Sequence, residues 1–418
     1  MPTAMVLAQR ALLLANNGRP TEALDLVDAM DGVDDPRVQA DLAAARSIGC
    51  LSVGRFAEAI DAARRGAAHQ DSLPAWQRRR GMAAHVLNEA HALAYAGRFG
   101  RARALVDEAI ERAQTAQARA ALVWFEVVLG EIERDSGRGA EAVVHFSAAA
   151  DLAGDVGQEA ALVWALVGIA QGHLLLGERD AAADALARAD AHDSPVATSR
   201  GTRERTRAWL LADQGDLAAA RALITEVAAE ARADSMWNFE CGVVHDLVRF
   251  GDPDAAVGRL DELERTVEGP YVQALAAHAR AASTGDVDRY LDAVERFEAL
   301  PCYVLGAEVA LELAELHRRT GSIRDAAAAR HRATRMLEEA GGAATPGLLR
   351  GDGAEQLSDR EREVALLAAS GMPSRDIAEK LFVSKRTIDS HLSSAYRKLG
   401  VAGRSDLRAA LEHRPAPA

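Results

Sequence analysis

The sequence predicts an all-α protein, an α-solenoid of about nine helical hairpins followed by a small four-helix domain. Three observations support this prediction. The 418 residues are 49% hydrophobic but only 4% aromatic, and helix-favouring residues outnumber the clusters of β-branched and aromatic residues that are typical of strands. A glycine-to-alanine step recurs through most of the chain. All three lysines, Lys380, Lys385 and Lys398, lie near the C-terminal end.

The repeated unit is an apolar helical segment, a glycine, a few polar residues and an alanine five positions after the glycine. Alanine holds the fifth position in eight of nine units, and Tyr290 is the exception. Glycine readily adopts the left-handed conformation that ends a helix, and alanine lets the next helix approach closely, so each unit is expected to be a hairpin. The nine glycines, spaced by 34 to 43 residues, are Gly18, Gly54, Gly97, Gly137, Gly177, Gly215, Gly251, Gly285 and Gly321.

Helical hairpins with this period resemble tetratricopeptide (TPR) repeats, which stack into a right-handed superhelix. The resemblance covers roughly residues 5–340, and an α-solenoid of another lineage is the alternative. We expect residues 1–340 to form a TPR-like domain that senses a signal or binds a partner. The chain begins almost within the first hairpin, without the polar cap that a solenoid end normally needs. Either Met1 begins a short form, or part of a longer architecture precedes it.

Several kinds of chemistry are excluded by the residues present. No lysine precedes Lys380, so a Walker phosphate loop cannot occur in the repeats, and zinc-binding spacings are absent. We therefore expect no enzyme activity, no cofactor and no metal. Cys50, Cys241 and Cys302 are far apart and are expected to be buried and reduced. No uninterrupted apolar run reaches the roughly 18 residues of a membrane span, so a soluble cytoplasmic protein without membrane contact is expected.

Residues 341–356 are predicted to be a semi-flexible linker, because five glycines, one proline and small residues break every helical period. The charge changes beyond it. Residues 355–414 hold eleven Lys+Arg and nine Asp+Glu, a net charge of +2, which leaves 38 basic and 53 acidic residues, a net of −15, in the rest of the chain. An acidic body repels nucleic acid, so only the C-terminal end is a candidate for binding DNA.

Four helices are expected in residues 357–413, followed by a disordered tail at 414–418. Gly371 ends the first helix, Ser384 caps the third, and the fourth lies near residues 405–412. The opposite faces of the third helix differ: one is polar and basic, which suits the major groove of DNA. The other face is an apolar stripe of Ile388, Leu392, Ala395 and Leu399.

The segment "LSDREREV…G…DIAEKLFVSKRTIDSHLSSAYRKLGV" resembles the LuxR/FixJ-type helix-turn-helix domain over about Leu357–Leu411. Together with the repeats it resembles the large LuxR-type regulators called LAL or MalT-like, although the ATPase usual in those is missing here. The resemblance implies that the third helix recognises DNA and the fourth contributes to dimerisation. The implied DNA-binding residues are Ser384, Lys385, Arg386, Thr387, Asp389, Ser390, His391, Ser393, Ser394, Arg397 and Lys398. The implied dimerisation residues are Leu407, Ala410 and Leu411.

Asp389 departs from the pattern that the resemblance suggests, because many relatives carry a long basic side chain among the base-reading positions. Asp389, Ser390 and Ser393 occupy those positions here. A carboxylate can accept a hydrogen bond from cytosine N4, but it costs affinity beside phosphates. The alternative is that Asp389 pairs with Lys385 or Arg386 on its own helix.

The leading hypothesis is a transcriptional regulator that binds double-stranded promoter DNA as a homodimer. The resemblance alone implies that it is an activator and that it contacts RNA polymerase. Its repeats would receive an unidentified protein, peptide or small-molecule signal. The second hypothesis is a repeat scaffold whose C-terminal domain serves only dimerisation, against which the intact Lys385, Arg386, Arg397 and Lys398 argue. A sigma-like promoter-recognition domain is the third, and it would not require the fourth helix.

Overall fold

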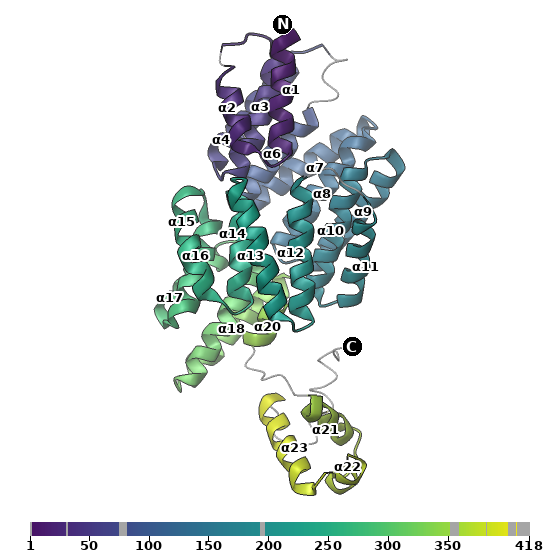
Figure 1. Cartoon of the computed structure of the whole chain (residues 1–418), viewed down its shortest axis with the longest axis vertical. Coiled ribbons are helices and arrows are strands. Elements are labelled where there is room, and N and C mark those ends of the chain that lie inside the picture. The colour runs from purple at the N-terminus through teal and green to yellow at the C-terminus, as the bar shows by residue number, and fades with distance from the viewer. Residues whose placement is uncertain are drawn as a thin grey trace. The chain divides into compact units, whose positions relative to one another are not determined.

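The computed structural model describes residues 2–30, 32–74, 82–192, 197–351, 359–381, 383–399 and Leu407. The chain divides into two compact units, residues 1–347 and residues 348–418. Within the described residues both units consist of helices without strands, as Figure 1 shows. The predicted all-α class is therefore confirmed.

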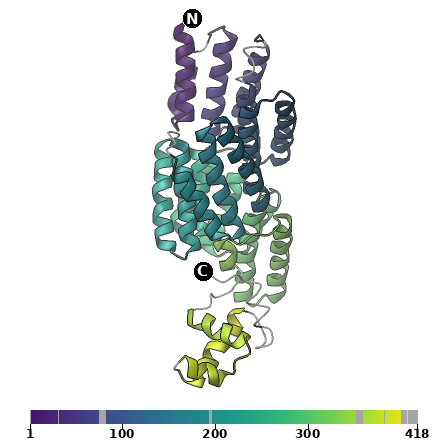
Figure 2. The same cartoon turned by 90° about the vertical axis from the view of Figure 1, so that its right-hand side faces the viewer.

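The N-terminal unit, here called the repeat domain, is built from nine hairpins among the described residues. Partners in each hairpin pack against each other, and Figure 2 shows successive hairpins side by side. The hairpins are α1 (Pro2–Asn16) with α2 (Pro20–Asp28), α3 (Pro36–Ser52) with α4 (Phe56–Asp71), α6 (Met82–Tyr95) with α7 (Phe99–Thr115), α8 (Arg119–Asp135) with α9 (Gly139–Val156), α10 (Glu159–Leu176) with α11 (Arg179–Asp190), α12 (Ala197–Asp213) with α13 (Leu217–Ala233), α14 (Trp237–Arg249) with α15 (Pro253–Thr266), α16 (Pro270–Thr284) with α17 (Val287–Glu298), and α18 (Tyr303–Arg319) with α19 (Ile323–Glu339).

The repeat glycines behave as the sequence predicts. All nine have a positive φ, from +63° at Gly285 to +91° at Gly215. The fifth position after each glycine is buried in every hairpin, and even Tyr290 is only 7% exposed. Because an alanine at this position projects a single methyl group, the second helix of each hairpin can lie close to the first.

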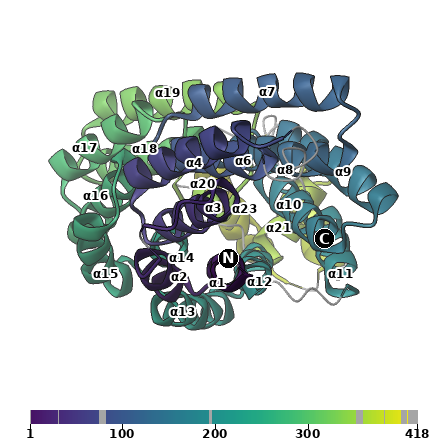
Figure 3. The ribbon, with the colours of Figure 1, turned by 90° about the horizontal axis from the view of Figure 1, so that it is seen from above.

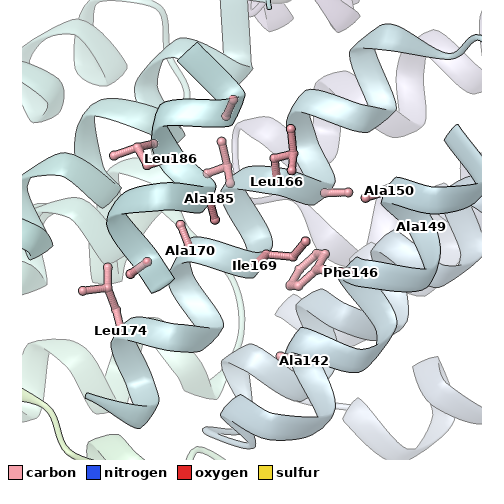
Figure 4. Close-up of a cluster of buried hydrophobic side chains, with 14 of the residues drawn as sticks. Ala142, Phe146, Ala149, Ala150, Leu166, Ile169, Ala170, Leu174, Ala185 and Leu186 are labelled. Carbon is pink, nitrogen blue, oxygen red and sulfur yellow. The ribbon is translucent and has the colours of Figure 1, made fainter. Parts of the chain in front are cut away.

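Phe146 of α9 shows how closely the hairpins approach one another. Its ring is fully buried in a core shared by the fourth and fifth hairpins, drawn in Figure 4. A Cβ added to Gly130 of α8 or Gly168 of α10 would come within 2.8 Å or 2.5 Å of this ring. Glycine is therefore required on both neighbouring helices for the ring to fit.

Helix α10 is long and apolar enough to cross a membrane by length and composition alone, and it is the one such helix in the described part of the chain. In the structure 56% of it is buried, and it packs against α8, α9, α11 and α12. Its apolar character is explained by its place in the core of the repeat domain.

The superhelix also closes on itself, so that hairpins far apart in sequence touch. Figure 3 shows the helices of the repeat domain arranged around a common axis. Gly54, in the turn of the second hairpin, lies against Val267, and its carbonyl accepts a hydrogen bond of 2.8 Å from the Glu268 amide. The Glu268 carboxylate in turn accepts one of 2.9 Å from the Ala57 amide.

Two further contacts continue this closure. The Ser136 carbonyl accepts a hydrogen bond from the Tyr303 amide (3.2 Å), and the Leu175 carbonyl accepts one from the Ala344 amide (2.8 Å). The Arg138 guanidinium lies 5.7 Å from the centre of the Tyr303 ring. The second, fourth and fifth hairpins therefore contact the segments that connect or follow the seventh, eighth and ninth hairpins.

The predicted linker is partly ordered, which differs from our expectation for residues 341–356. Ala344 bonds to Leu175, the buried Thr345 hydroxyl bonds to the Glu308 carboxylate, and residues 346–351 form the short helix α20 (Pro346–Gly351). These contacts hold the start of the segment on the repeat domain in spite of its glycines. Residues 352–358 lie outside the described part of the chain.

The C-terminal unit contains α21 (Asp359–Ala369), α22 (Ser374–Lys380) and α23 (Lys385–Leu399). Gly371, with φ of +92°, lies in the turn that follows α21, as expected for a glycine that ends this helix. The expected fourth helix and the tail at 414–418 lie outside the described residues, except for Leu407, which is helical.

The three cysteines are buried and unpaired, which confirms the expectation for their burial. Removal from water raises the pKa of the Cys50 thiol to about 12. A thiol with such a pKa stays protonated near neutral pH and is a poor nucleophile, so its role is in packing.

Gly54→Ala should lower the midpoint of thermal unfolding more than Gly18→Ala. Both positions require a positive φ, which costs other residues about 1–2 kcal/mol. A Cβ at Gly54 would additionally lie 2.7–2.9 Å from Val267, whereas nothing lies within 4 Å of a Cβ at Gly18. Calorimetry of the full chain measures the two midpoints. Equal losses would contradict the close packing of the Gly54 turn against Val267.

Candidate nucleic-acid interface

The start of α23 is fixed by the side chain of Ser384. The Thr387 amide donates a hydrogen bond of 3.1 Å to Ser384 Oγ, and the two hydroxyls are 2.7 Å apart. Such an N-cap satisfies one of the amides that a helix start leaves without a partner. The predicted cap is confirmed, and it places Lys385 and Arg386 in the first turn.

One face of α23 is buried in the C-terminal unit. Ile388, Leu392 and Ala395 are at most 5% exposed and share a core with Ile377 and Ala378 of α22. Residues Val364, Ala365 and Ala368 of α21 complete this core. Three residues of the predicted apolar stripe, Ile388, Leu392 and Ala395, therefore hold the helix in this core. The side chain of the fourth, Leu399, lies outside the described residues.

The opposite face of α23 presents the residues expected to bind DNA. Thr387 and His391 are half-buried at its edges. The side chains of Ser394, Arg397 and Lys398 are outside the described residues, although the helix continues through their positions. The exposed members of the set are Ser384, Lys385, Arg386, Asp389, Ser390 and Ser393.

Asp389 is exposed near the middle of this face. The described residues of this unit do contain an ion pair, between Arg360 and Glu363 at 2.7 Å, but none joins Asp389 to Lys385 or Arg386. The alternative in which Asp389 is neutralised by a neighbour on its own helix is therefore not what the structure shows. No ion pair of its carboxylate occurs within the described part of the C-terminal unit.

Arg360 connects α21 to the end of α22. Its Nη2 donates a hydrogen bond of 2.7 Å to the Leu381 carbonyl, while Nη1 pairs with Glu363. Leu381 lies just before the turn that leads into α23, so Arg360 helps to position the start of α23.

Leu407 corrects one expectation for dimerisation. Its side chain is fully buried and packs in the core of the C-terminal unit. A side chain without exposed surface cannot make a direct contact with a second subunit, so Leu407 stabilises the fold of its own domain. Ala410 and Leu411 lie outside the described residues.

The sequence reasoning missed a chain of buried charges in the repeat domain. Arg205 donates to Asp246 at 2.6 and 3.1 Å, Asp246 also lies 3.7 Å from Arg249, and Arg249 forms a bidentate pair with Glu308 at 2.7 Å. Glu308 accepts the hydrogen bond from Thr345. Charged residues inside otherwise apolar segments such as "CGVVHDLVRF" are the signal that could have indicated this network.

Comparison with known proteins agrees with this geometry. Residues 355–410 match the family model described as bacterial regulatory proteins, luxR family. Over 49 residues the chain is 47% identical to the spore germination protein GerE of Bacillus subtilis, a match that covers 12% of this chain and 66% of that protein. A candidate HTH-type transcriptional regulator of Mycobacterium bovis is 47% identical over 51 residues, but only 6% of its length is covered. The C-terminal unit is therefore a LuxR-type helix-turn-helix domain.

The repeat domain matches a different set of proteins by structure. The crystal structure of a Rap protein complexed with Competence and Sporulation Factor superposes with a TM-score of 0.58 and 12% identity, covering 82% of this chain and 99% of that one. The likeness establishes a TPR-like helical-repeat fold. The matched family is one of bacterial regulatory proteins, and the fold of the repeat domain is shared with a Rap protein.

Ser384→Ala should destabilise the start of α23 by about 1 kcal/mol, because the Thr387 amide loses its acceptor. Amide exchange in the first turns of α23 should accelerate about fivefold, measured by hydrogen–deuterium exchange and mass spectrometry. Ser390→Ala, an exposed substitution on the same helix, is the matched control and should change exchange little. Similar exchange rates in both variants would show that the cap does not stabilise the helix.

Proposed function

We propose that this chain is a cytoplasmic transcriptional regulator that binds promoter DNA as a homodimer through α23 and receives a signal through its repeat domain. The observation that carries the proposal is the division of α23 into two faces within a LuxR-type domain. Its inner face is locked in a core, while Lys385, Arg386 and Asp389 point to solvent. A rigid helix with an exposed polar and basic face suits the major groove.

The exposed residues divide into two roles in this proposal. Lys385 and Arg386, in the first turn, hold phosphates and thereby fix the helix in the groove. Asp389, Ser390 and Ser393 read base edges, and a carboxylate selects a cytosine N4 donor. Ser384, Thr387, His391, Ser394, Arg397 and Lys398 line the groove edge or contact the backbone.

Dimerisation follows from the small number of base-reading side chains. Three short side chains discriminate poorly between sequences, so two subunits on half-sites about one helical turn apart are needed for specificity. Ala410 and Leu411 of the fourth helix are proposed to contribute to the contact between subunits. An activator role with a contact to RNA polymerase is proposed on the LuxR-type resemblance alone.

Reception of a signal is proposed for the repeat domain. The Rap protein of similar fold was crystallised with Competence and Sporulation Factor, so this type of superhelix is able to hold a signalling molecule. In this chain the buried Thr345 and Glu308 anchor the segment that leads toward the DNA-binding domain. A signal that alters the repeat domain would therefore act on residues next to that connection.

Replacing both Lys385 and Arg386 with glutamine should weaken binding of the full chain to its own upstream DNA by at least about tenfold at ~100 mM salt, because two phosphate contacts are lost. A gel-shift titration measures this. Arg289→Gln, an exposed arginine of the repeat domain, is the matched control and should bind as the wild type does. Unchanged DNA binding in the double variant would refute recognition of DNA through α23. Binding of protein partners does not distinguish the two hypotheses, because a repeat scaffold would keep its partners in this variant.

Asp389→Asn should raise affinity for DNA of random sequence by about three- to tenfold, because the substitution removes a negative charge that phosphates repel. Selection of bound sequences from a random pool should also show a changed base preference at one position of each half-site. Asp288→Asn in the repeat domain is the control for the loss of one negative charge. Identical affinity and preference in Asp389→Asn and wild type would mean that Asp389 does not face the DNA.

A further inference from the structure

A pocket lies inside the repeat domain, between helices of hairpins that are far apart in sequence. Side chains of α6, α7, α8, α12, α14 and α16 line it. The closure of the superhelix brings these helices together, as the ring of helices in Figure 3 shows.

Two guanidinium groups reach the pocket, and each is held by a neighbouring carboxylate, one of which, Asp135, also lines the pocket. Arg134 uses Nε for Asp135 and Nη1 for Gln171, both at 2.8 Å. Arg205 uses Nε and Nη2 for Asp246 and the Gly242 carbonyl. Within the described residues, Arg134 Nη2 and Arg205 Nη1 have no hydrogen-bond partner. The pocket therefore offers preorganised donors for an anion, since planar guanidinium groups match a carboxylate.

Three neutral polar groups also lie in the pocket wall. The hydroxyls of Tyr95 and Tyr271 and the amide of Asn238 are half-buried, and no hydrogen-bond partner for them occurs among the described residues. Burial raises the pKa of both tyrosines, so their hydroxyls remain protonated and able to donate. A ligand that accepts hydrogen bonds is able to use these donors.

Aromatic side chains form part of the remaining wall. Phe99 and Phe239 line the pocket beside the rings of Tyr95 and Tyr271. The Tyr95 ring is supported from outside the pocket by Phe56, whose ring centre lies 6.0 Å away. Rings held in this way favour a flat apolar group, which packs against them by stacking or edge contacts.

We propose that this pocket binds an aromatic carboxylate, with the carboxylate between Arg134 and Arg205 and the ring among the four aromatic side chains. The inference rests on the proposed function in one respect: it names the chemical class of the signal. Arg205 shares Asp246 with Arg249, which pairs with Glu308, the acceptor of Thr345. A carboxylate on Arg205 Nη1 therefore adds a negative charge close to Asp246, within the network that anchors the segment after α19.

Calorimetric titration of the full chain with sodium benzoate and sodium phenylacetate tests the site. At least one acid should bind with an affinity at least tenfold above that of benzamide, its neutral counterpart. Asn238→Asp, which adds a negative charge to the wall with almost no change of shape, should weaken that binding at least tenfold. Asn17→Asp, an exposed amide at the end of α1, is the matched control and should leave it unchanged.

Failure of both acids to bind, or equal binding of acid and amide, would overturn the proposal. So would a wild-type affinity in Asn238→Asp. Circular dichroism verifies that the variant is folded, and Tyr271→Phe, which removes only one hydroxyl, provides a second variant expected to bind more weakly. Gel shifts on the same preparations separate the two proposals: a chain that binds its upstream DNA but no acid refutes the pocket alone, and the reverse result refutes the DNA-binding function alone.

Discussion

In every hairpin of the repeat domain, a glycine in the left-handed region ends one helix, and a small or buried side chain five residues later lies against that helix. The glycine fixes the turn, and the side chain sets how near the two helices approach. Nine nearly equal hairpins then accumulate a constant rotation, which produces the superhelix. The same turns later serve as contact surfaces: Gly54 lies against Val267, and the Ser136 carbonyl accepts from Tyr303. A larger residue at Gly54 would therefore disturb the superhelix as well as its own hairpin.

The parts of the structure that could be predicted from the sequence depend on short-range patterns. The nine glycines, the buried stripe of Ile388, Leu392 and Ala395, and the Ser384 cap are all set within a few residues. Contacts between distant residues could not be predicted in this way. The Gly54–Glu268 bond spans more than 200 residues, and it depends on the summed curvature of the hairpins between them.

Two differences from the sequence-based predictions have the same physical origin. Glycine-rich residues 341–356 were expected to be a linker on composition, yet Ala344 and Thr345 find hydrogen-bond partners on α10 and α18 that composition cannot reveal. Leu407 was expected at a subunit contact, yet it fills the core beneath α23. In both cases a partner distant in sequence decides the role of a residue. The buried chain from Arg205 to Thr345 was missed for the same reason, since single charges in apolar helices show no period.

The two units differ in their charged residues. The repeat domain is acidic and carries its exposed charges largely as arginine–carboxylate pairs, whereas the C-terminal unit concentrates its lysines near α23. The central claim is that DNA is bound through these basic residues by two copies of the chain. The dependence of DNA affinity on salt concentration tests it most directly, because each phosphate contact releases counterions. With four to six basic contacts in each subunit, the logarithm of the affinity should fall against the logarithm of salt concentration with a slope of about −7 to −10. A slope near zero would contradict the claim.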